Sequence, residues 1–228
     1  METNFDKIKL PKRAPIPFVN DYQPELDTAP VLNAAQVNHF QSQIGVLICK
    51  VELRRIDIMT KASLLSSHLA MPREGNIDAV YRIFGCLKHK HNSCVIFDPT
   101  YPLIEQAGFN FLIWGFYGGA TAAIPPNAPK PLGKEVDLRL FCDFDHVGDG
   151  KTRRYRNGFF IFLNMAPIVW LSKKQPTIET RVFGTEFVAM IIVMETLFGV
   201  WYKLRVMDIP LSWPSYIYYD NVPVIHNT

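Results

Sequence analysis

The sequence predicts a mixed α+β fold, in which a strand-rich C-terminal part follows a helical segment. Apolar residues between positions 35 and 89 recur at the three- and four-residue spacing of a helix face. Three strand-like runs over residues 136–172 precede a long apolar helix over residues 183–207, and a short aromatic strand at 216–219 follows. Strands in close succession, then a helix and another strand, indicate a mixed sheet with helices packed on it.

The first 32 residues are expected to form a proline-rich tether, because prolines interrupt every potential helix. Residues 33–98 form the predicted helical segment, with helices at 35–52, 56–69 and 74–89 and a short strand at 95–97. His89 and His91 suggest a metal pair, but a charge interacting with the helix dipole explains them better. Residues 99–135, rich in proline, glycine and aromatic residues, are interpreted as a linker that docks.

Residues 136–228 are the predicted strand-rich domain. Its strands are expected at 136–143, 158–164 and 166–172, close enough in sequence for an antiparallel meander. The helix at 183–207 has one predicted apolar face, and two prolines separate it from the last strand. That predicted face comprises Phe187, Met190, Ile191, Met194, Leu197 and Trp201.

Composition excludes several classes of protein. The chain has 228 residues, 48% of them hydrophobic, which is ample for a packed core, and a net charge of only +3. Its four cysteines lack Cys-x-x-Cys spacing and no secretory signal precedes them, so reduced thiols in the cytoplasm or nucleus are expected. Glu195, Asn164 and Pro167 interrupt the most apolar windows, so neither a transmembrane segment nor a membrane partner is predicted.

Three acidic residues occupy positions that suit a divalent-cation site. Asp143 ends the first strand, Glu186 lies near the start of the long helix, and Asp220 follows the last strand. Such positions can gather carboxylates at one sheet edge, where hard cations find oxygen ligands. The segment from Asp143 also suggests a calcium loop, but an EF-hand fails at two ligand positions. Asp145 and Asp149 are therefore best explained as turn residues.

Five motifs in one order resemble the ribonuclease H domain of Copia-type retrotransposon polyproteins. They are Asp143-Phe-Asp145-His-Val-Gly-Asp149, Thr152-Arg-Arg154 with Gly158, Ala166-Pro-Ile-Val-Trp170 with Ser172-Lys-Lys-Gln175, Thr185-Glu-Phe-Val-Ala189, and Asp220-Asn221. Residues 41–88 are also similar to the part that follows the polymerase palm in these polyproteins. The resemblance covers nearly all of the chain after residue 30 and implies a ribonuclease H-like sheet for residues 136–228.

The resemblance implies a catalytic role for the three acids. Asp143, Glu186 and Asp220 would be the catalytic metal ligands, holding Mg²⁺ or Mn²⁺ for cleavage of RNA paired with DNA. Family members usually carry a fourth acid after Asp220, which this sequence does not reach, so we expect weak or lost activity. The polymerase Asp-Asp motif and a Gly-rich phosphate loop are absent, which excludes DNA synthesis by this chain.

Basic residues at strand ends are candidates for contact with nucleic acid, although such runs are also typical of solvated turns. The alternatives to a nuclease are a noncatalytic module for nucleic-acid binding or polyprotein assembly, and an inert relic. The expected partners are an RNA–DNA hybrid or other nucleic acid and other parts of the polyprotein. The candidate contact residues are Lys151, Arg153, Arg154, Arg156, Lys173 and Lys174.

Overall fold

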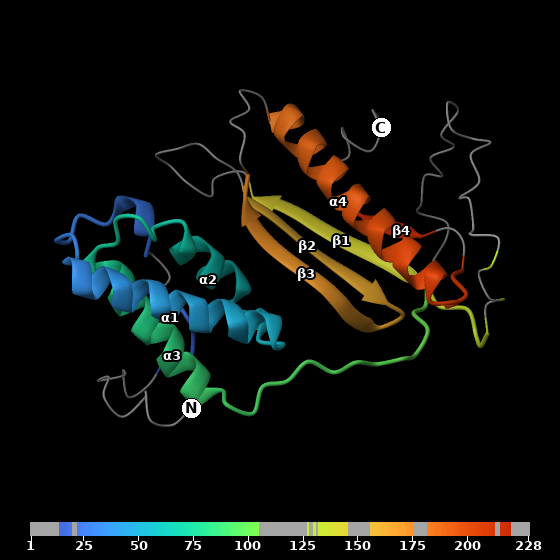
Figure 1. Ribbon diagram of the computed structural model, residues 1–228, viewed down its shortest axis with the longest axis horizontal. Helices are drawn as coiled ribbons and strands as arrows, with labels where there is room; N and C mark the ends of the chain where they lie inside the picture. Colours follow the sequence, from blue (N-terminus) through green and yellow to red (C-terminus); the bar gives the residue numbers. More distant parts are fainter. Residues whose placement is uncertain are drawn as a thin grey trace. The chain divides into compact units, whose positions relative to one another are not determined.

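The computed structural model contains helices and one four-stranded sheet (Figure 1). It describes residues 14–19, 22–104, 127, 130, 132–145, 156–175, 182–212 and 215–219. The helices are η2 (Pro24–Leu26), α1 (Ala34–Glu52), η3 (Ile56–Ile58), α2 (Met59–Ser66), α3 (Glu74–His89) and α4 (Val182–Val206). The strands are β1 (Leu138–Asp145), β2 (Arg156–Leu163), β3 (Ala166–Lys174) and β4 (Tyr216–Tyr218).

The predicted fold class, a mixed α+β arrangement of a mixed sheet with helices, is confirmed, and its strand order is consistent with a ribonuclease H-like sheet. The strand order is β3-β2-β1-β4. β2 and β3 form a hairpin joined at Asn164 and Met165, while β4 returns beyond α4 to pair in parallel with β1. A parallel neighbour needs a crossover connection, and α4 supplies it. Pro167 is tolerated because β3 is an edge strand of the described sheet.

Asn164 fixes the hairpin to the start of β1. Its backbone adopts a left-handed conformation (φ 54°), which asparagine tolerates better than most residues. Its side-chain oxygen accepts from the Asp137 amide at 2.9 Å, and its side-chain nitrogen donates to the Pro99 carbonyl at 2.9 Å. Its amide nitrogen donates to the Asp137 carbonyl at 2.8 Å. One buried residue therefore holds together three separate segments of the chain.

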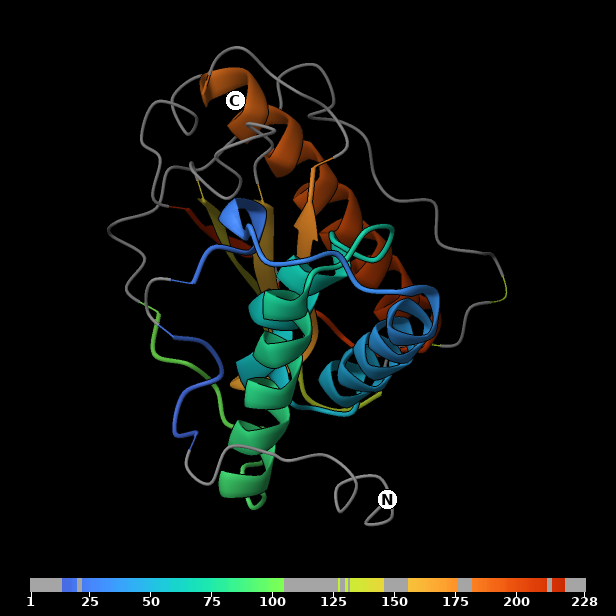
Figure 2. The same cartoon turned by 90° about the vertical axis from the view of Figure 1, so that its left-hand side faces the viewer.

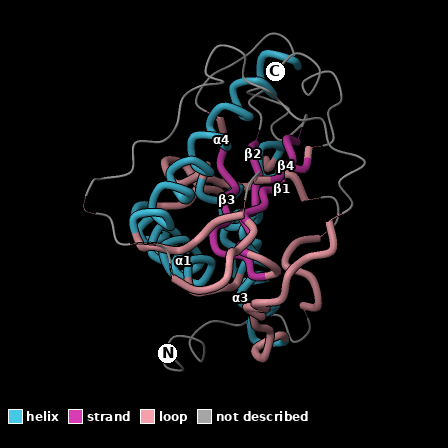
Figure 3. The backbone as a smooth tube through the Cα atoms, turned by 90° about the vertical axis from the view of Figure 1, so that its right-hand side faces the viewer, coloured by secondary structure: helices cyan, strands magenta, loops and turns pink. Residues whose placement is uncertain are grey.

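α4 lies against one face of the sheet (Figures 1 and 3). Alternate residues of β1 and β2 are fully buried, as a covered sheet face requires. Leu138, Leu140, Phe159 and Ile161 form this buried set.

The predicted apolar face of α4 is partly wrong. Phe187 and Ile191 are exposed, whereas Met190 and Leu197 are buried as expected. The buried face is rotated because α4 is apolar nearly all round, so the sequence alone does not indicate which side meets the sheet. The face buried in the structure comprises Glu186, Ala189, Met190, Val193, Leu197 and Leu204.

The stretch Glu186–Val206 of α4 is also long and apolar enough to cross a membrane. Its mean hydropathy is 1.6, and 22% of the apolar window is buried inside the structure. A single helix of this kind is a weak indication of a membrane protein. Glu195 lies near its middle, where a bilayer would disfavour a charge.

Helices α1, α2 and α3 pack together, and Figure 2 shows α1 in blue and α3 in green. Each contributes apolar residues to a common core, among them Phe40, Leu65 and Ile83. The predicted helix over 56–69 is interrupted, since η3 precedes α2 and α2 ends at Ser66. Residues 95–97 form no strand, contrary to the prediction.

The chain groups into two compact units. The helical unit holds the chain up to Val95 together with the ends of β2 and β3 that adjoin Gly158 and Leu171. The sheet unit holds most of the four strands, with α4 and the chain from Ile96 to β1. Within the predicted tether, Ala14, Phe18 and Leu32 are buried in the core.

Candidate nuclease site on the parallel strand pair

The parallel pairing of β1 with β4 positions the strands that carry two of the predicted acids. Phe141 pairs with Tyr218, and their rings stack with centroids 4.3 Å apart and planes 5° from parallel. Upstream, the Val136 amide donates to the Pro210 carbonyl at 2.9 Å, which continues the association of the two segments. The register is therefore set by several contacts along the pair.

Asp143 lies two residues beyond Phe141 in β1, and its side chain is exposed. Asp220 is two residues beyond Tyr218 in the sequence, but it lies outside the described residues. Because parallel strands advance in the same direction, equal steps from a paired position lead to neighbouring positions. In the sequence, Asp143 and Asp220 are thus each two residues beyond the paired residues Phe141 and Tyr218.

Glu186 comes from α4, near the helix N-terminus, and is only 6% exposed. Glu186 shares the buried face of α4 with Met190 and Val193, the face turned from solvent. Burial of a carboxylate is costly unless it is paired, and Glu186 does have an interaction partner.

Convergence of Asp143, Glu186 and Asp220 stays a prediction, because the third acid is outside the described residues. Among the residues that are described, no group of three His, Cys, Asp or Glu side chains could hold a metal ion. The carboxylate oxygens of the two described acids are nevertheless the ligand type that Mg²⁺ and Mn²⁺ prefer.

The basic candidates differ in environment. Lys173 is exposed and Lys174 half-buried near the end of β3. Lys151, Arg153 and Arg154 lie outside the described residues.

Arg156 has a structural role instead of the expected contact with phosphate. It is 7% exposed, and its guanidinium donates to the hydroxyls of Ser63 and Ser67 within the helical unit. A guanidinium used in this way is not available to a nucleic-acid backbone.

The sheet also carries a row of half-exposed rings that sequence reasoning missed. This aromatic face comprises Phe141, Phe160, Phe162 and Tyr218. The Phe141 and Phe162 rings meet edge to face at 5.4 Å, and the Arg139 guanidinium carbon lies 5.9 Å from both ring centroids. The sequence pattern could have predicted this face, because residues 139 and 141 of β1 and residues 160 and 162 of β2 are alternate positions, which lie on one side of a strand.

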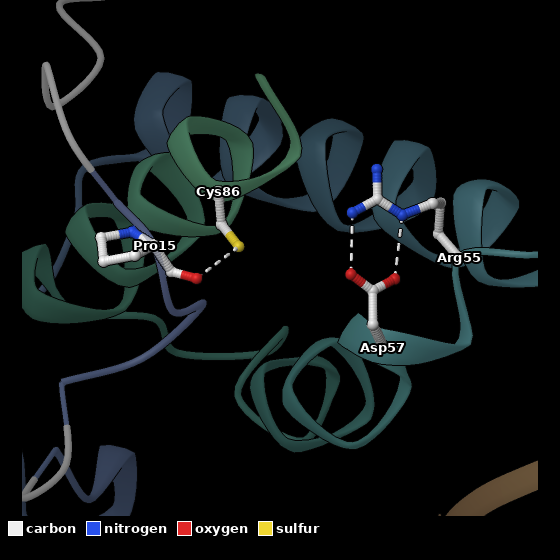
Figure 4. A network of polar contacts seen from close by, with 4 residues as sticks. All are labelled: Pro15, Arg55, Asp57 and Cys86. Carbon is white, nitrogen blue, oxygen red and sulfur yellow. Dashed lines mark hydrogen bonds and ion pairs between the residues drawn. The ribbon is translucent and has the colours of Figure 1, made fainter. Parts of the chain in front are cut away.

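Polar contacts in the helical unit are structural (Figure 4). Arg55 donates two hydrogen bonds to Asp57, at 2.9 and 2.7 Å, and these lower the pKa of the Asp57 carboxyl.

The Cys86 thiol contacts the Pro15 carbonyl at 3.8 Å, and burial raises the pKa of that thiol. A raised thiol pKa opposes formation of the reactive thiolate, so Cys86 does not suit a nucleophile.

Comparison with known proteins identifies retrotransposon relatives. The chain is 30% identical over 103 residues to the "Retrovirus-related Pol polyprotein from transposon RE2" of Arabidopsis thaliana, which covers 42% of this chain and 7% of that protein. It is 28% identical over 103 residues to the corresponding polyprotein from transposon RE1, with the same two coverages. An uncharacterized mitochondrial protein of the same plant, AtMg00810, is 35% identical over 63 residues, which cover 28% of this chain and 26% of that protein.

The chain therefore spans only a small part of the polyproteins it matches. No family model matches the sequence, and no solved structure matches the fold. The similarity is to retrotransposon Pol polyproteins as a class.

Proposed function

We propose that this chain is a ribonuclease H-like domain of Copia-type retrotransposon origin that binds an RNA–DNA hybrid and cleaves its RNA strand slowly. The observation that carries the proposal is the β1–β4 register, which gives Asp143 and Asp220 the same offset from the Phe141–Tyr218 pair. The buried Glu186 on α4 and the similarity to Pol polyproteins support it.

The proposed roles follow from the chemistry of the three acids. Asp143, on the strand, would hold the cations and keep them at the sheet edge, and Glu186 and Asp220 would complete the oxygen ligands. Bound Mg²⁺ or Mn²⁺ supplies an activated water and stabilises the charge on the leaving oxygen.

Incubation of the purified full chain with a labelled RNA–DNA hybrid tests this proposal. We expect slow cleavage of the RNA strand that requires Mg²⁺ or Mn²⁺ and is abolished in Asp143→Asn. Asp78→Asn is the matched control, because Asp78 is an exposed acid on α3. Metal-independent cleavage, or equal activity in Asp143→Asn, would contradict the proposed site.

The aromatic face favours a second candidate, a noncatalytic nucleic-acid-binding module. Half-exposed rings on one sheet face can stack on the bases of a nucleic acid. Fluorescence anisotropy with a labelled single strand and a labelled hybrid separates the two candidates. Binding that Phe160→Ala weakens, without any cleavage in Mg²⁺ or Mn²⁺, would favour the binding module over the nuclease.

A further inference from the structure

α4 presents two apolar faces, of which the sheet accounts for only one. The face that includes Met190, Val193 and Leu197 is buried. Half a turn away, a second row of apolar residues is exposed, with Phe198 58% and Tyr202 52% accessible. This apolar stripe comprises Phe187, Ile191, Phe198, Tyr202 and Val206.

The stripe extends along most of the helix. Its members are separated by four, seven, four and four residues, spacings that keep side chains on one side of a helix. A helix that is apolar all round is normally covered on all sides, and contiguous exposed apolar surface marks an interaction site. We therefore expect a partner to cover this stripe.

Gly199 and two charges show what kind of partner fits. Glu195 lies four residues before Gly199, and Lys203 four residues after it; both side chains are exposed. The three residues fall within an arc of about 80°, which begins at Glu195 inside the stripe and ends at Lys203, between the stripe and the buried face. Within the described part of the chain, the Arg55–Asp57 pair is the recorded salt bridge, and neither Glu195 nor Lys203 belongs to it.

This arrangement is self-complementary. If two copies of α4 cross antiparallel at Gly199, Glu195 of each copy faces Lys203 of the other, since both lie about 6 Å from the crossing point along the helix. A Cβ built on Gly199 meets no atom within 4 Å, so among the described residues no side chain occupies that space. Antiparallel helices also oppose their dipoles favourably.

We propose that the apolar stripe of α4 is a homodimer interface, in which a second copy of this chain packs antiparallel about Gly199 and forms two reciprocal Glu195–Lys203 ion pairs. The dimer would bury Phe198 and Tyr202 of both copies beside the crossing point. It is independent of the proposed nuclease function, because Glu186 lies on the opposite face of the helix.

The charges favour a second copy over a lipid bilayer. Glu195 lies within the stripe, and a carboxylate on a hydrocarbon-facing surface is expensive. In the antiparallel dimer, the Glu195 carboxylate forms an ion pair with Lys203 of the second copy at the rim of the interface.

Charge reversal with sedimentation equilibrium of the full chain tests the proposal. The wild type is expected to dimerise reversibly at micromolar concentration. Glu195→Lys and Lys203→Glu each turn two attractions into two repulsions, so we expect the dimer dissociation constant to rise roughly tenfold or more in each. Circular dichroism checks that both variants remain folded.

The decisive samples combine the two changes. An equimolar mixture of Glu195→Lys and Lys203→Glu pairs opposite charges at both contacts, as does the double variant, so both should dimerise like the wild type. Glu52→Lys, an exposed acid of α1 reversed in the same way, is the control and should leave the constant unchanged.

Three outcomes overturn the proposal: a wild type that stays monomeric, single variants that dimerise like the wild type, or a mixture that fails to recover dimerisation. Monomeric wild type that sediments with phosphatidylcholine–phosphatidylserine vesicles would assign the stripe to lipid. Gly199→Leu provides an independent check, because its side chain fills the crossing point and should weaken the dimer without unfolding the chain.

Discussion

The helical unit holds its buried polar residues through structural hydrogen bonds, whereas the candidate functional residues lie in the sheet unit. In the helical unit, Asn76 is 1% exposed, and its side chain accepts from the Arg73 amide at 2.8 Å and donates to the Tyr22 hydroxyl at 2.9 Å. That hydroxyl donates to Asp27 at 3.3 Å, and Asp27 accepts from the Ala29 amide. These contacts cap α3 and fasten the preceding segment to it, so packing alone explains them.

The functional candidates lie in the sheet unit. Glu186 carries a carboxylate on a buried helix face, Asp143 presents one to solvent at a strand end, and α4 keeps an apolar stripe exposed. The strand-end position of Asp143 and the similarity to Pol polyproteins make these acids the residues to test for binding or catalysis. We therefore expect the helical unit to have a structural role and the sheet unit to hold the residues for binding or catalysis.

The largest expected effect is on cleavage. Glu186→Gln keeps the size of the side chain but removes its charge. The variant should therefore fold, but it should bind the cations less tightly than the wild type. We expect hybrid cleavage to fall by about a hundredfold or more. A gel assay of the labelled RNA strand in Mg²⁺ and Mn²⁺ measures it.

Asn76→Ala is the matched substitution in the helical unit. It should lower the free energy of unfolding by about 2 kcal/mol, because it removes a helix cap and a hydrogen bond to Tyr22. Cleavage per folded molecule should not change. If Asn76→Ala reduced cleavage as much as Glu186→Gln, the contrast between the units would fail.

The next prediction concerns the contribution of Asn164, in the sheet unit, to the free energy of unfolding. Asn164→Ala removes two side-chain hydrogen bonds, to Asp137 and Pro99, and places alanine in a left-handed conformation. We expect a loss of about 3 kcal/mol in the free energy of unfolding, measured by urea denaturation. Asn92→Ala, at an exposed turn, is the control and should change stability by less than about 0.5 kcal/mol.

Sequence periodicity was sufficient for most of the fold. α3 begins and ends where apolar spacing predicted, and β1 through β4 occur in the predicted order. The parallel return of β4 was also foreseeable, because one long helix separates it from the meander. The spacing of apolar residues along the chain determines these elements, so they can be predicted from a single sequence.

The remaining features depend on contacts between distant residues. The roles of Tyr22 and Asn76 needed a partner more than fifty residues away, and the proline-rich composition around Phe18 gave no indication of its burial. The buried side of α4 was not predictable because the helix lacks a polar face. The acids at 143, 186 and 220 were selected by local position and resemblance, which cannot establish their convergence.

A third prediction compares glycines in helices of the two units. A Cβ on Gly75 would clash with the Asp27 carboxylate, whereas one on Gly199 meets nothing within 4 Å. Gly199→Ala should therefore raise the free energy of unfolding of the monomer by about 0.5 to 1 kcal/mol through helix propensity. Gly75→Ala should gain nothing, because Asp27 must move and its hydrogen bonds weaken.

Thermal and urea unfolding at low protein concentration measure both variants without a contribution from self-association. Gly45→Ala in α1 is the control, since its Cβ also meets nothing within 4 Å, and it should match Gly199→Ala. Equal stabilisation by all three alanines would show that the contact of Gly75 with Asp27 does not constrain the helical unit.

The smallest effect is the pH dependence of the Arg55–Asp57 pair in the helical unit. Hydrogen bonding from Arg55 lowers the pKa of Asp57 in the folded chain. The stabilisation is therefore fully present above the unfolded-state pKa of about 3.9 and is lost as pH falls through the folded value. Because the Asp57 side chain is 42% exposed, solvent screening limits the effect to about 0.5 kcal/mol. Urea denaturation should show wild type more stable than Asp57→Asn by this amount at neutral pH, with the difference vanishing in acid. A difference that grew in acid would mean that the carboxylate is destabilising, contrary to its paired geometry.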